Sequence, residues 1–517
     1  MSDRSFYRLA PFIQEYIYSH GWAELRPVQI EACRVIFDTD AHLLLAAGTA
    51  SGKTEAAFLP VLTLLQEKPA TTIAVLYIGP IKALINDQFE RLNDLLKEAD
   101  IPVWHWHGDV SQSRKKQLLK EPKGILQITP ESLESLLINK NSELVRLFGD
   151  LQFVIIDELH AFMGSERGCQ ILCQLARLSR FVQKPPRRIG LSATLGDYSL
   201  AAQWLQAGTE RLVITSDLKA GQRKLYLAVE HFYNRAGEQA SNSISPYYRY
   251  IFNNTKSRKC LIFANNRAST ESVIATLRQI AESEGLPDIY HVHHGSISAR
   301  LRQAAENAMR EPTAPAVTAA TVTLEMGIDI GQLERVIQLE APLSVSSFLQ
   351  RLGRSGRRGE PADMRFVCAE DEPSGEESLP EQIPWQLLQA IAIIQLYLEE
   401  RWIEPIRPVQ YSLSLLYHQT MSILAAMGEL SPAALAAQVL TLPPFSAISK
   451  DDFRQLLRYL IDIDHIHQSE QGGLIVGLTG EKMVRSFQFY AVFADNKEYA
   501  VRDDSMEIGS RHWSSKE

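Results

Sequence analysis

The chain has 517 residues, of which 45% are hydrophobic and 22% are charged, and these proportions are typical of a soluble globular protein. Its net charge of −8 excludes a non-specific cationic coat, so any contact with nucleic acid must come from a local surface. No apolar run is long enough to span a bilayer, the first residues lack the pattern of a secretory signal, and the five cysteines show neither disulfide nor metal-site spacing. We therefore expect a cytoplasmic protein without a membrane partner.

Short apolar segments alternate with helical patterns from residue 41 to about residue 215. This alternation is typical of a parallel sheet that helices cover on both faces. Residues 1–40 are mostly helical in pattern, and together with this block they form the expected first domain, residues 1–215. Its strands are expected at 42–46, 72–78, 102–106, 124–128, 152–156 and 187–191.

The first of these strands leads into a loop of small residues and then into a helix start. Such a loop turns its backbone N–H groups around phosphate oxygens, and the helix N-terminus adds the positive end of its dipole. Lys53 can reach the outer phosphates, and the Thr54 hydroxyl is a natural Mg²⁺ ligand. Ala47 stands where the usual motif has glycine. The sequence therefore predicts that a nucleoside triphosphate binds at Ala47, Gly48, Thr49, Ala50, Ser51, Gly52, Lys53 and Thr54.

Polar residues end two later strands of the same block. Asp157 and Glu158 follow the strand at 152–156, at the edge where ligands bind in parallel sheets. Asp157 can hold Mg²⁺ through water, and Glu158 can orient and deprotonate an attacking water. Ser192 and Thr194 follow the strand at 187–191 and can relay the nucleotide state to a neighbouring domain, although a simple strand-end turn would also explain them.

A second alternating block runs from about residue 223 to residue 370, and the expected second domain is 216–372. Near its end, Gly353 and Gly356 let the backbone bend, so that Arg354 and Arg357 project their guanidinium groups. Arginine supplied by a facing domain stabilises the charge of a transferring phosphoryl group. An RNA-binding turn and a solvated turn are the alternatives. The strands of this block are expected near 259–264, 288–293, 316–320, 334–339 and 364–368.

The acidic, turn-rich segment 370–377 has the composition of a linker. Helices are expected after it at 382–399, 411–428, 431–440 and 450–462, followed by two β-like pieces at 463–468 and 473–478. Helices followed by a small hairpin predict a winged-helix domain over residues 373–485. Residues 486–517 are expected to form a short strand-like extension and a polar tail.

The combined motifs resemble those of superfamily 2 DEAD/DEAH-box-like helicases, with motif I at 47–54, motif II at 157–160, motif III at 192–194 and motif VI at 350–357. This resemblance implies an α/β fold with two tandem RecA-like domains. Segments at 128–137, 160–168, 188–195, 293–296 and 324–331 are similar to the large-helicase-related (Lhr) group. Members of that group usually continue into large C-terminal domains, and the chain is expected to lack most of that region.

The resemblance also implies roles for individual residues. Gln29 is expected to read adenine, and Gly327 and Asp329 to complete the nucleotide site. The expected catalytic residues are Lys53, Asp157, Glu158, Arg354 and Arg357, with Mg²⁺ on Thr54 and Asp157. Coupling between the domains is expected of His160, Ser192, Thr194 and Gln350. Small or polar groups at loop and helix starts suit phosphate contacts, and such contacts are expected at Pro80, Lys82, Gly108, Thr129, Pro130, Asn265, Arg267, His294, Gly295 and Thr321.

The expected function is that of an ATP-dependent helicase or translocase with ATP and Mg²⁺ as cofactors. The resemblance favours 3′ to 5′ movement on single-stranded DNA and a role in DNA repair or genome defence. The partner would be single-stranded or tailed duplex nucleic acid, with DNA favoured. Two alternatives stay open: an RNA or RNA–DNA hybrid helicase, and an ATP-switched nucleic-acid-binding subunit of a larger protein complex that does not unwind.

Overall fold

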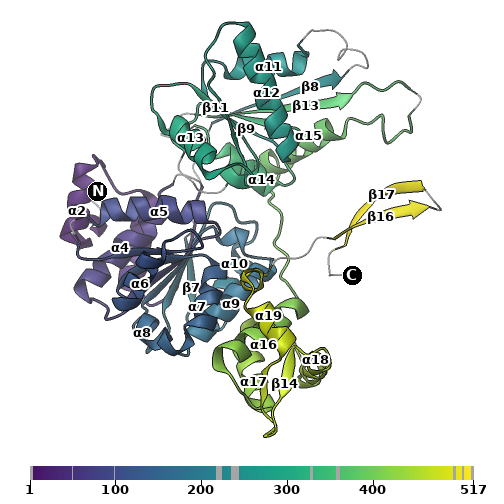
Figure 1. Ribbon diagram of the computed structural model, residues 1–517. Coiled ribbons are helices and arrows are strands. Elements are labelled where there is room, and N and C mark those ends of the chain that lie inside the picture. The colour runs from purple at the N-terminus through teal and green to yellow at the C-terminus, as the bar shows by residue number, and fades with distance from the viewer. Residues whose placement is uncertain are drawn as a thin grey trace.

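The computed structural model of the protein describes residues 4–48, 51–97, 99–216, 224–234, 244–325, 330–356, 361–375, 377–492, 497–503 and 506–513. Two α/β domains and a smaller helical domain follow one another along this part of the chain (Figure 1). No helix among the described residues has both the length and the apolar character that crossing a membrane requires.

The first α/β domain alternates strands with helices, as the sequence predicts. Its strands are β1 (His42–Ala46), β2 (Ile73–Ile78), β3 (Val103–Trp106), β4 (Gly124–Ile128), β5 (Phe153–Ile156), β6 (Arg187–Ser192) and β7 (Val213–Ser216). Its helices are α1 (Ser5–Arg8), α2 (Pro11–Ser19), α3 (Pro27–Asp38), α4 (Lys53–Glu67), α5 (Lys82–Leu95), α6 (Gln112–Lys120), α7 (Pro130–Asn139), α8 (Leu144–Phe148), α9 (Glu166–Leu178) and α10 (Tyr198–Gln206).

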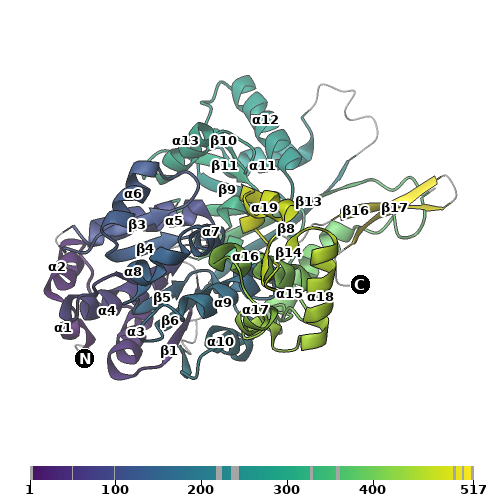
Figure 2. The same ribbon diagram turned by 60° about the horizontal axis from the view of Figure 1, so that its bottom comes forward.

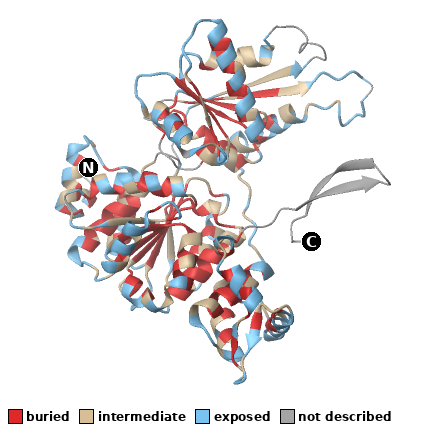
Figure 3. Ribbon diagram, in the orientation of Figure 1, coloured by how far each residue is buried: buried red, intermediate tan, exposed pale blue. Residues whose placement is uncertain are grey.

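The seven strands form one sheet in the order β3-β4-β2-β5-β6-β1-β7, and every pairing in it is parallel. All residues of β1, β2, β5 and β6 are buried, because helices cover both faces of the sheet (Figure 3). The carboxyl ends of these strands lie at one edge. That edge carries the loops in which the sequence placed its phosphate and carboxylate motifs.

The second α/β domain has a six-stranded parallel sheet in the order β10-β11-β9-β12-β13-β8. Its strands are β8 (Leu225–Asn234), β9 (Lys259–Phe263), β10 (Tyr290–His293), β11 (Ala316–Ala320), β12 (Arg335–Leu339) and β13 (Ala362–Asp371). Its helices are α11 (Pro246–Thr255), α12 (Arg267–Ser283), α13 (Ala299–Arg310), α14 (Val345–Leu352) and α15 (Trp385–Leu398). The sequence did not predict β7 and β8, which lie at the sheet edges, where partial exposure weakens the apolar pattern.

Helix α15 belongs to the second α/β domain, which corrects the boundary expected at residues 372–373. Ala390 and Ile393 of α15 are buried in the same hydrophobic cluster as Met364 and Phe366 of β13. The acidic segment 370–377 therefore connects two elements of one domain. Its first two residues end β13, and residues 372–375 and 377 are exposed, so the linker-like composition belongs to an exposed connection within the domain.

A smaller helical domain covers residues 413–492, and we call it the C-terminal domain. An isolated bridge between Leu430 and Leu474 adds a third short strand segment to its hairpin. The order of its elements is helix, bridge, two helices and hairpin, and the winged helix stays a prediction for this domain. Its elements are α16 (Leu413–Met427), α17 (Pro432–Val439), α18 (Lys450–Asp462), β14 (Ile466–Gln468), β15 (Leu474–Val476) and α19 (Leu478–Val484), and a separate hairpin of β16 (Lys497–Asp503) and β17 (Met506–Trp513) follows.

The C-terminal domain docks on the first α/β domain through α16, which packs against α7 and α9 (Figure 2). A buried polar network lies in this contact. Arg177 of α9 forms an ion pair with Glu134 of α7 at 2.6 Å, and it also donates to Gln419 and Ser422 of α16 at 3.1 and 2.8 Å. Burial alone would raise the pKa of Glu134, but the charges of Arg177 and His418 and two hydrogen bonds lower it to about 2. The charged carboxylate therefore stabilises the docking above pH 4.5, and this contribution is lost as the pH falls toward 2.

Replacing Arg177 with methionine is expected to destabilise the protein by about 3–5 kcal/mol, because the Glu134 carboxylate stays buried without its partner. The double variant Glu134→Leu/Arg177→Met is expected to recover most of this loss, since both charges are then removed. Thermal unfolding measures the stability of both variants, and limited proteolysis of the folded proteins reports whether the C-terminal domain stays docked. Arg146→Ala, which breaks an exposed ion pair with Glu143, is the control. An Arg177→Met variant no less stable than that control would contradict the role of the network.

Candidate nucleotide site between the two domains

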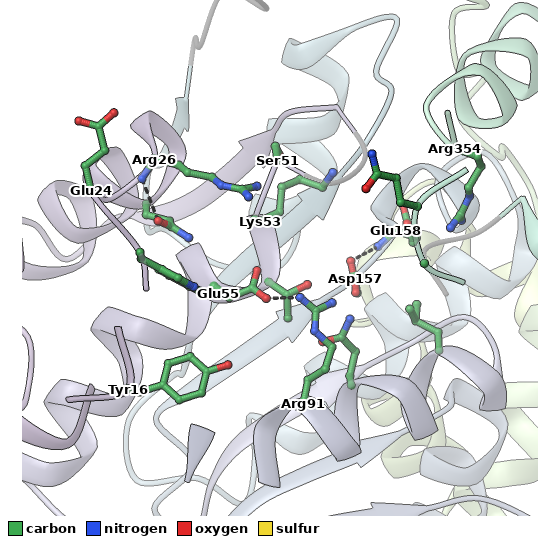
Figure 4. Close-up of a pocket in the computed structure, with 18 of the residues that line it drawn as sticks. Tyr16, Glu24, Arg26, Ser51, Lys53, Glu55, Arg91, Asp157, Glu158 and Arg354 are labelled. Atoms are coloured by element: carbon green, nitrogen blue, oxygen red, sulfur yellow. Dashed lines mark hydrogen bonds and ion pairs between the residues drawn. The ribbon is translucent and has the colours of Figure 1, made fainter. Parts of the chain in front are cut away.

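A cavity of about 870 Å³ opens at the carboxyl ends of β1 and β5 (Figure 4). The first α/β domain supplies most of its lining, including the predicted Gln29, Lys53 and Thr54. The second α/β domain contributes Gly331, Gln332 and Arg354. The volume lies within the range of small-molecule sites. The cavity is thus a ligand-sized space that both domains have to complete.

The phosphate loop follows β1 and ends at Gly52, the N-cap of α4. Gly52 has a φ of 84°, in the left-handed region that favours glycine. The backbone conformation therefore favours glycine, and a Cβ atom at this position would lie 3.1 Å from Nε2 of Gln29, so the glutamine side chain would have to shift. The short distance also shows that Gln29, the predicted adenine-reading residue, lies beside the loop. Thr49 and Ala50, predicted in the same loop, lie outside the described residues.

Lys53 is held inside the loop that it follows. Its Nζ donates to the carbonyl oxygens of Ala47 at 2.5 Å and Gly48 at 3.0 Å. Burial lowers the pKa of the Lys53 ammonium, while the nearby carboxylates of Glu158 and Asp157 raise it. The ammonium therefore faces the two carboxylates across the space that the loop encloses. A phosphate group entering the loop would find hydrogen-bond donors on one side and the carboxylate pair on the other.

The carboxylate pair follows β5 and is almost completely buried. Oδ1 of Asp157 accepts the backbone N–H of Glu158 at 2.8 Å, and Oδ2 accepts the hydroxyl of Tyr77. Burial and the Glu158 charge raise the pKa of Asp157 to about 6. Glu158 has a φ of 47°, a costly conformation for a residue other than glycine. Among the described residues its Oε2 accepts no hydrogen bond, although Nδ1 of His160 lies 3.5 Å away.

These observations fit a divalent cation. Two buried carboxylates carry more negative charge and more acceptor capacity than their protein partners satisfy, and the Thr54 hydroxyl lines the same cavity. Oxygen donors of this kind are the ligands that Mg²⁺ prefers, alongside water and substrate phosphates. Thr54 and Asp157 would hold the ion, as the sequence predicts.

Binding of Mg²⁺ with a non-hydrolysable ATP analogue is expected to weaken as the pH falls below about 6. The pKa of Asp157 is raised from 3.8, so its buried charge costs stability above pH 6, and protonation at lower pH relieves that cost. A bound cation lowers the pKa of Asp157, so binding of the cation should release protons at about pH 6. Calorimetry in buffers of different ionisation enthalpy measures the release. Asp157→Asn should abolish it; equal proton release from that variant would refute the assignment.

Arg354 approaches the cavity from the second α/β domain, just after α14. It is only 1% exposed, and its Nη2 donates to the carbonyl of Glu325 at 2.8 Å. Its charge is close enough to Lys53 to lower the pKa of that ammonium further. Figure 4 shows Arg354 across from Glu158. The geometry therefore places a cation of one domain beside the carboxylates of the other, whereas Arg357, Gly327 and Asp329 lie outside the described residues.

The four residues predicted to couple the domains form one hydrogen-bonded chain. Nδ1 of His160 lies 3.0 Å from Oγ of Ser192. On the other side of the ring, Nε2 of His160 lies 2.8 Å from the side-chain amide nitrogen of Gln350. The same amide nitrogen also donates to Oγ1 of Thr194 at 3.5 Å. The Gln350 amide nitrogen can only donate, so Nε2 of His160 accepts and its proton sits on Nδ1. Burial lowers the pKa of His160 to about 4. The neutral imidazole therefore bridges the nucleotide edge of the first domain and α14 of the second.

Three supporting residues were not singled out from the sequence. Tyr77, the only polar side chain of β2, orients Asp157. Arg351 of α14 donates twice to Oε2 of Glu325, at 3.1 and 2.9 Å, and once to Gln338 at 2.6 Å. Glu325 thus anchors Arg351 with its side chain and Arg354 with its carbonyl. A lone tyrosine in an apolar strand was the only sequence signal; the Glu325 contacts arise from folding.

The predicted nucleic-acid residues lie at the carboxyl ends of other strands. In the first sheet they follow β2, β3 and β4, which lie on one side of β5, while β1 and the phosphate loop lie on the other side. In the second sheet they follow β9, β10 and β11. His294 is buried against Glu271 at 2.9 Å, and the Thr129 side chain caps α7. Pro80 and Pro130 are also buried, Asn265 and Thr321 are partly exposed, and Lys82, Gly108, Arg267 and Gly295 are exposed.

Comparison with known families and structures agrees with this geometry. The DEAD/DEAH box helicase model matches residues 26–201, and the helicase conserved C-terminal domain model matches residues 243–359. The ATP-dependent helicase Lhr-Core of Saccharolobus solfataricus is 33% identical over 376 residues, which cover 69% of this chain and 42% of the relative. The Lhr helicase/uracil glycosylase of Escherichia coli is 31% identical over 61% of this chain and 24% of its own length. The chain thus spans less than half the length of these relatives.

Solved structures extend the similarity to the C-terminal domain. The Mycobacterium smegmatis helicase Lhr bound to ssDNA and AMP-PNP has a TM-score of 0.79 at 26% identity, covering 95% of this chain and 63% of that chain. The DUF1998 helicase MrfA bound to DNA has the same fold, with a TM-score of 0.71 at 21% identity over 98% of this chain and 68% of its own. The two α/β domains are therefore RecA-like, and the chain belongs to the DEAD/DEAH box helicases of superfamily 2 and is similar to the Lhr group within them.

Proposed function

We propose that the protein hydrolyses ATP between its RecA-like domains and uses the cycle to move along single-stranded nucleic acid. One observation carries this proposal: Lys53, the Asp157–Glu158 pair and Arg354 of the opposite domain line a single cavity. A binding site for nucleotide alone would not need a buried carboxylate in a strained conformation beside a cation from a second domain. Those groups serve a reaction in which charge develops on a transferring phosphoryl group.

Each residue has a chemical task in this reaction. Glu158 accepts a proton from the attacking water, and its fixed backbone conformation aims the carboxylate into the cavity. Lys53 and the N–H groups of the loop bind the phosphates, and Arg354 stabilises their charge in the transition state. When bound, Mg²⁺ on Thr54 and Asp157 supplies further neutralisation of the phosphate charge. Water attack then occurs only where the two domains meet.

The coupling chain links this chemistry to movement of the domains. Gln350 belongs to α14 and precedes Arg354 by four residues, and its partner His160 follows Glu158 by two residues. A shift of α14 would therefore displace Arg354 and the His160 contact together. Nucleic acid would lie across the carboxyl ends of the remaining strands, where Lys82 and Arg267 are exposed and the backbone can bind phosphates. A strand gripped by both domains is displaced when they separate.

The relatives favour DNA as the polymer, since the similar Lhr and MrfA structures were solved with DNA. Movement from 3′ to 5′ and a role in repair or genome defence belong to the same proposal and rest on the resemblance to the Lhr group. Structures with lower TM-scores bind RNA, for example Mss116p bound to ssRNA at 0.59 and 17% identity. They keep the RNA helicase as a second candidate.

ATP turnover measured with single-stranded DNA, with single-stranded RNA and without polymer tests the proposal. Strand displacement on duplexes with 3′ or 5′ tails, made of DNA or RNA, completes the test. We expect stimulation by DNA and displacement from 3′ tails. Stimulation by RNA alone would favour the RNA helicase. Stimulation without displacement would favour an ATP-switched nucleic-acid-binding subunit, and no turnover with any polymer would refute the proposed reaction.

A further inference from the structure

Residues 399–412 connect α15 to α16, and we call them the connector. The connector runs from the second RecA-like domain along the first to the C-terminal domain (Figure 1). Ile403 packs on the hydrophobic core of the second domain, and Ile406 packs on a core of the first. Farther along, Ser412 and Ser414 both donate to Oε1 of Glu166, at 2.8 and 2.6 Å. The connector therefore crosses the boundary between the domains within a few residues.

Glu404 lies at this crossing, and its carboxylate caps α14. Its two oxygens accept the backbone N–H groups of Val345 and Ser346, the latter at 3.0 Å. The hydroxyl of Ser344 accepts the next N–H, that of Ser347, at 3.0 Å. The first three N–H groups of α14 are thus satisfied, and the carboxylate also matches the positive end of the helix dipole. A residue about 60 positions later in the chain supplies two of these three contacts.

The opposite side of the same connector residues touches the first domain. A Cβ atom on Gly196 would lie 2.7 Å from the carbonyl oxygen of Glu404 and 2.9 Å from that of Ile403. Gly196 follows Thr194, a member of the coupling chain, by two residues. A Cβ on Gly164 would likewise lie 2.9 Å from the carbonyl oxygen of Arg407. The connector backbone is therefore packed directly on loops that follow two nucleotide motifs of the first domain.

We propose that Glu404 is a positioning residue for ATP hydrolysis, which fixes α14 relative to the first domain. Its side chain holds the start of the helix that carries Gln350 and precedes Arg354, while its backbone rests on the loop that follows Thr194. The nucleotide site is thereby connected through space to the segment that leads into the C-terminal domain. This inference rests on the proposed function, because positioning matters only if ATP is hydrolysed.

The role predicts a specific kinetic effect. The phosphate loop and Gln29 belong to the first domain, so loss of the Glu404 contact should leave the KM for ATP nearly unchanged. In Glu404→Ala, Arg354 would be less well aligned with the phosphates, so kcat should fall by roughly tenfold. This factor corresponds to the free energy that is lost when a strong helix cap is removed. Glu404→Gln keeps one acceptor oxygen and should show an intermediate kcat. A residue that served only the stability of the fold would not separate kcat from KM.

The experiment uses the full chain and two measurements. Polymer-stimulated ATP turnover gives kcat and KM for the wild type, Glu404→Ala, Glu404→Gln and the control Glu400→Ala, which removes an exposed carboxylate four residues earlier. Amide hydrogen exchange over residues 343–349 reports the capping contact directly. We expect faster exchange and lower kcat in Glu404→Ala, partial effects in Glu404→Gln and no change in the control. Gly196→Ala, which pushes the connector off the first domain, should lower kcat in the same way.

The two hypotheses fail differently. Unchanged exchange over residues 343–349, or a kcat equal to that of Glu400→Ala, would overturn the role of Glu404 while the wild type still hydrolyses ATP. A raised KM with normal kcat would overturn it as well, because Glu404 would then act on nucleotide binding. Absence of turnover in the wild type would refute the proposed function, and hydrogen exchange would still test the contact.

Discussion

Glutamine in place of Glu158 is expected to reduce polymer-stimulated ATP turnover by roughly 10²–10⁴-fold, the usual contribution of a general base. The substitution removes the proton acceptor but preserves size and hydrogen-bonding capacity. ATP should still bind, because the phosphate loop and Lys53 are untouched. Turnover measured at saturating ATP and polymer, together with the Kd of a fluorescent ATP analogue, separates the two effects.

The matched control is Glu121→Gln, which changes an exposed carboxylate of the same domain and should leave turnover at the wild-type level. Lys53→Ala should also abolish turnover, but through weaker nucleotide binding, since the ammonium lies within the phosphate loop. The two variants thus differ in the affinity that remains. Undiminished turnover in both Glu158→Gln and Lys53→Ala would show that this cavity is not the catalytic site.

The second large effect concerns Arg354, whose replacement by alanine is expected to slow hydrolysis by roughly 10³–10⁵-fold, as for arginine fingers in general. The guanidinium belongs to the second domain but lines the cavity beside Asp157 and Glu158. Its contribution appears in the transition state, so the affinity for ATP should change little. Single-turnover hydrolysis of pre-bound ATP measures the chemical step directly.

Arg354→Lys provides a stringent comparison, because it keeps the positive charge but loses the planar fork, and it should recover only part of the rate. Arg146→Ala removes an exposed arginine of the first domain and serves as the surface control. Because Arg354 is buried and bonded to Glu325, circular dichroism must confirm that each variant is folded. A folded Arg354→Ala protein with normal single-turnover rates would show that hydrolysis does not need the Arg354 guanidinium.

Local sequence patterns were sufficient to predict the strands of both large sheets other than β7 and β8, and to locate the loop that follows β1. Strand β1 occupies the predicted residues 42–46, because an uninterrupted apolar run followed by a glycine-containing turn has few other structural solutions. The strand ends that carry Asp157, Ser192 and Gly52 meet at one edge, as parallel topology requires. The geometry confirms their proximity, while their catalytic roles stay predictions.

Contacts between distant segments could not be predicted in this way. The apolar pattern of α15 shows that the helix needs a partner, but it does not show whether the second sheet or the C-terminal domain provides it. The same holds for Glu325, which binds Arg351, and for Glu404, which caps a helix about 60 residues earlier in the chain. Such contacts depend on tertiary packing, which periodicity in a single sequence does not encode.

The buried network around Arg177 has a consequence for how the domains would move in the proposed ATP cycle. Buried charges connect the C-terminal domain to the first RecA-like domain. Separating the two domains would leave these charges without their partners, so we expect the two domains to move as one rigid body. Displacement during each ATP cycle would then fall on the second RecA-like domain alone. The hairpin of β14 and β15 would then keep a constant position relative to the phosphate loop through the cycle.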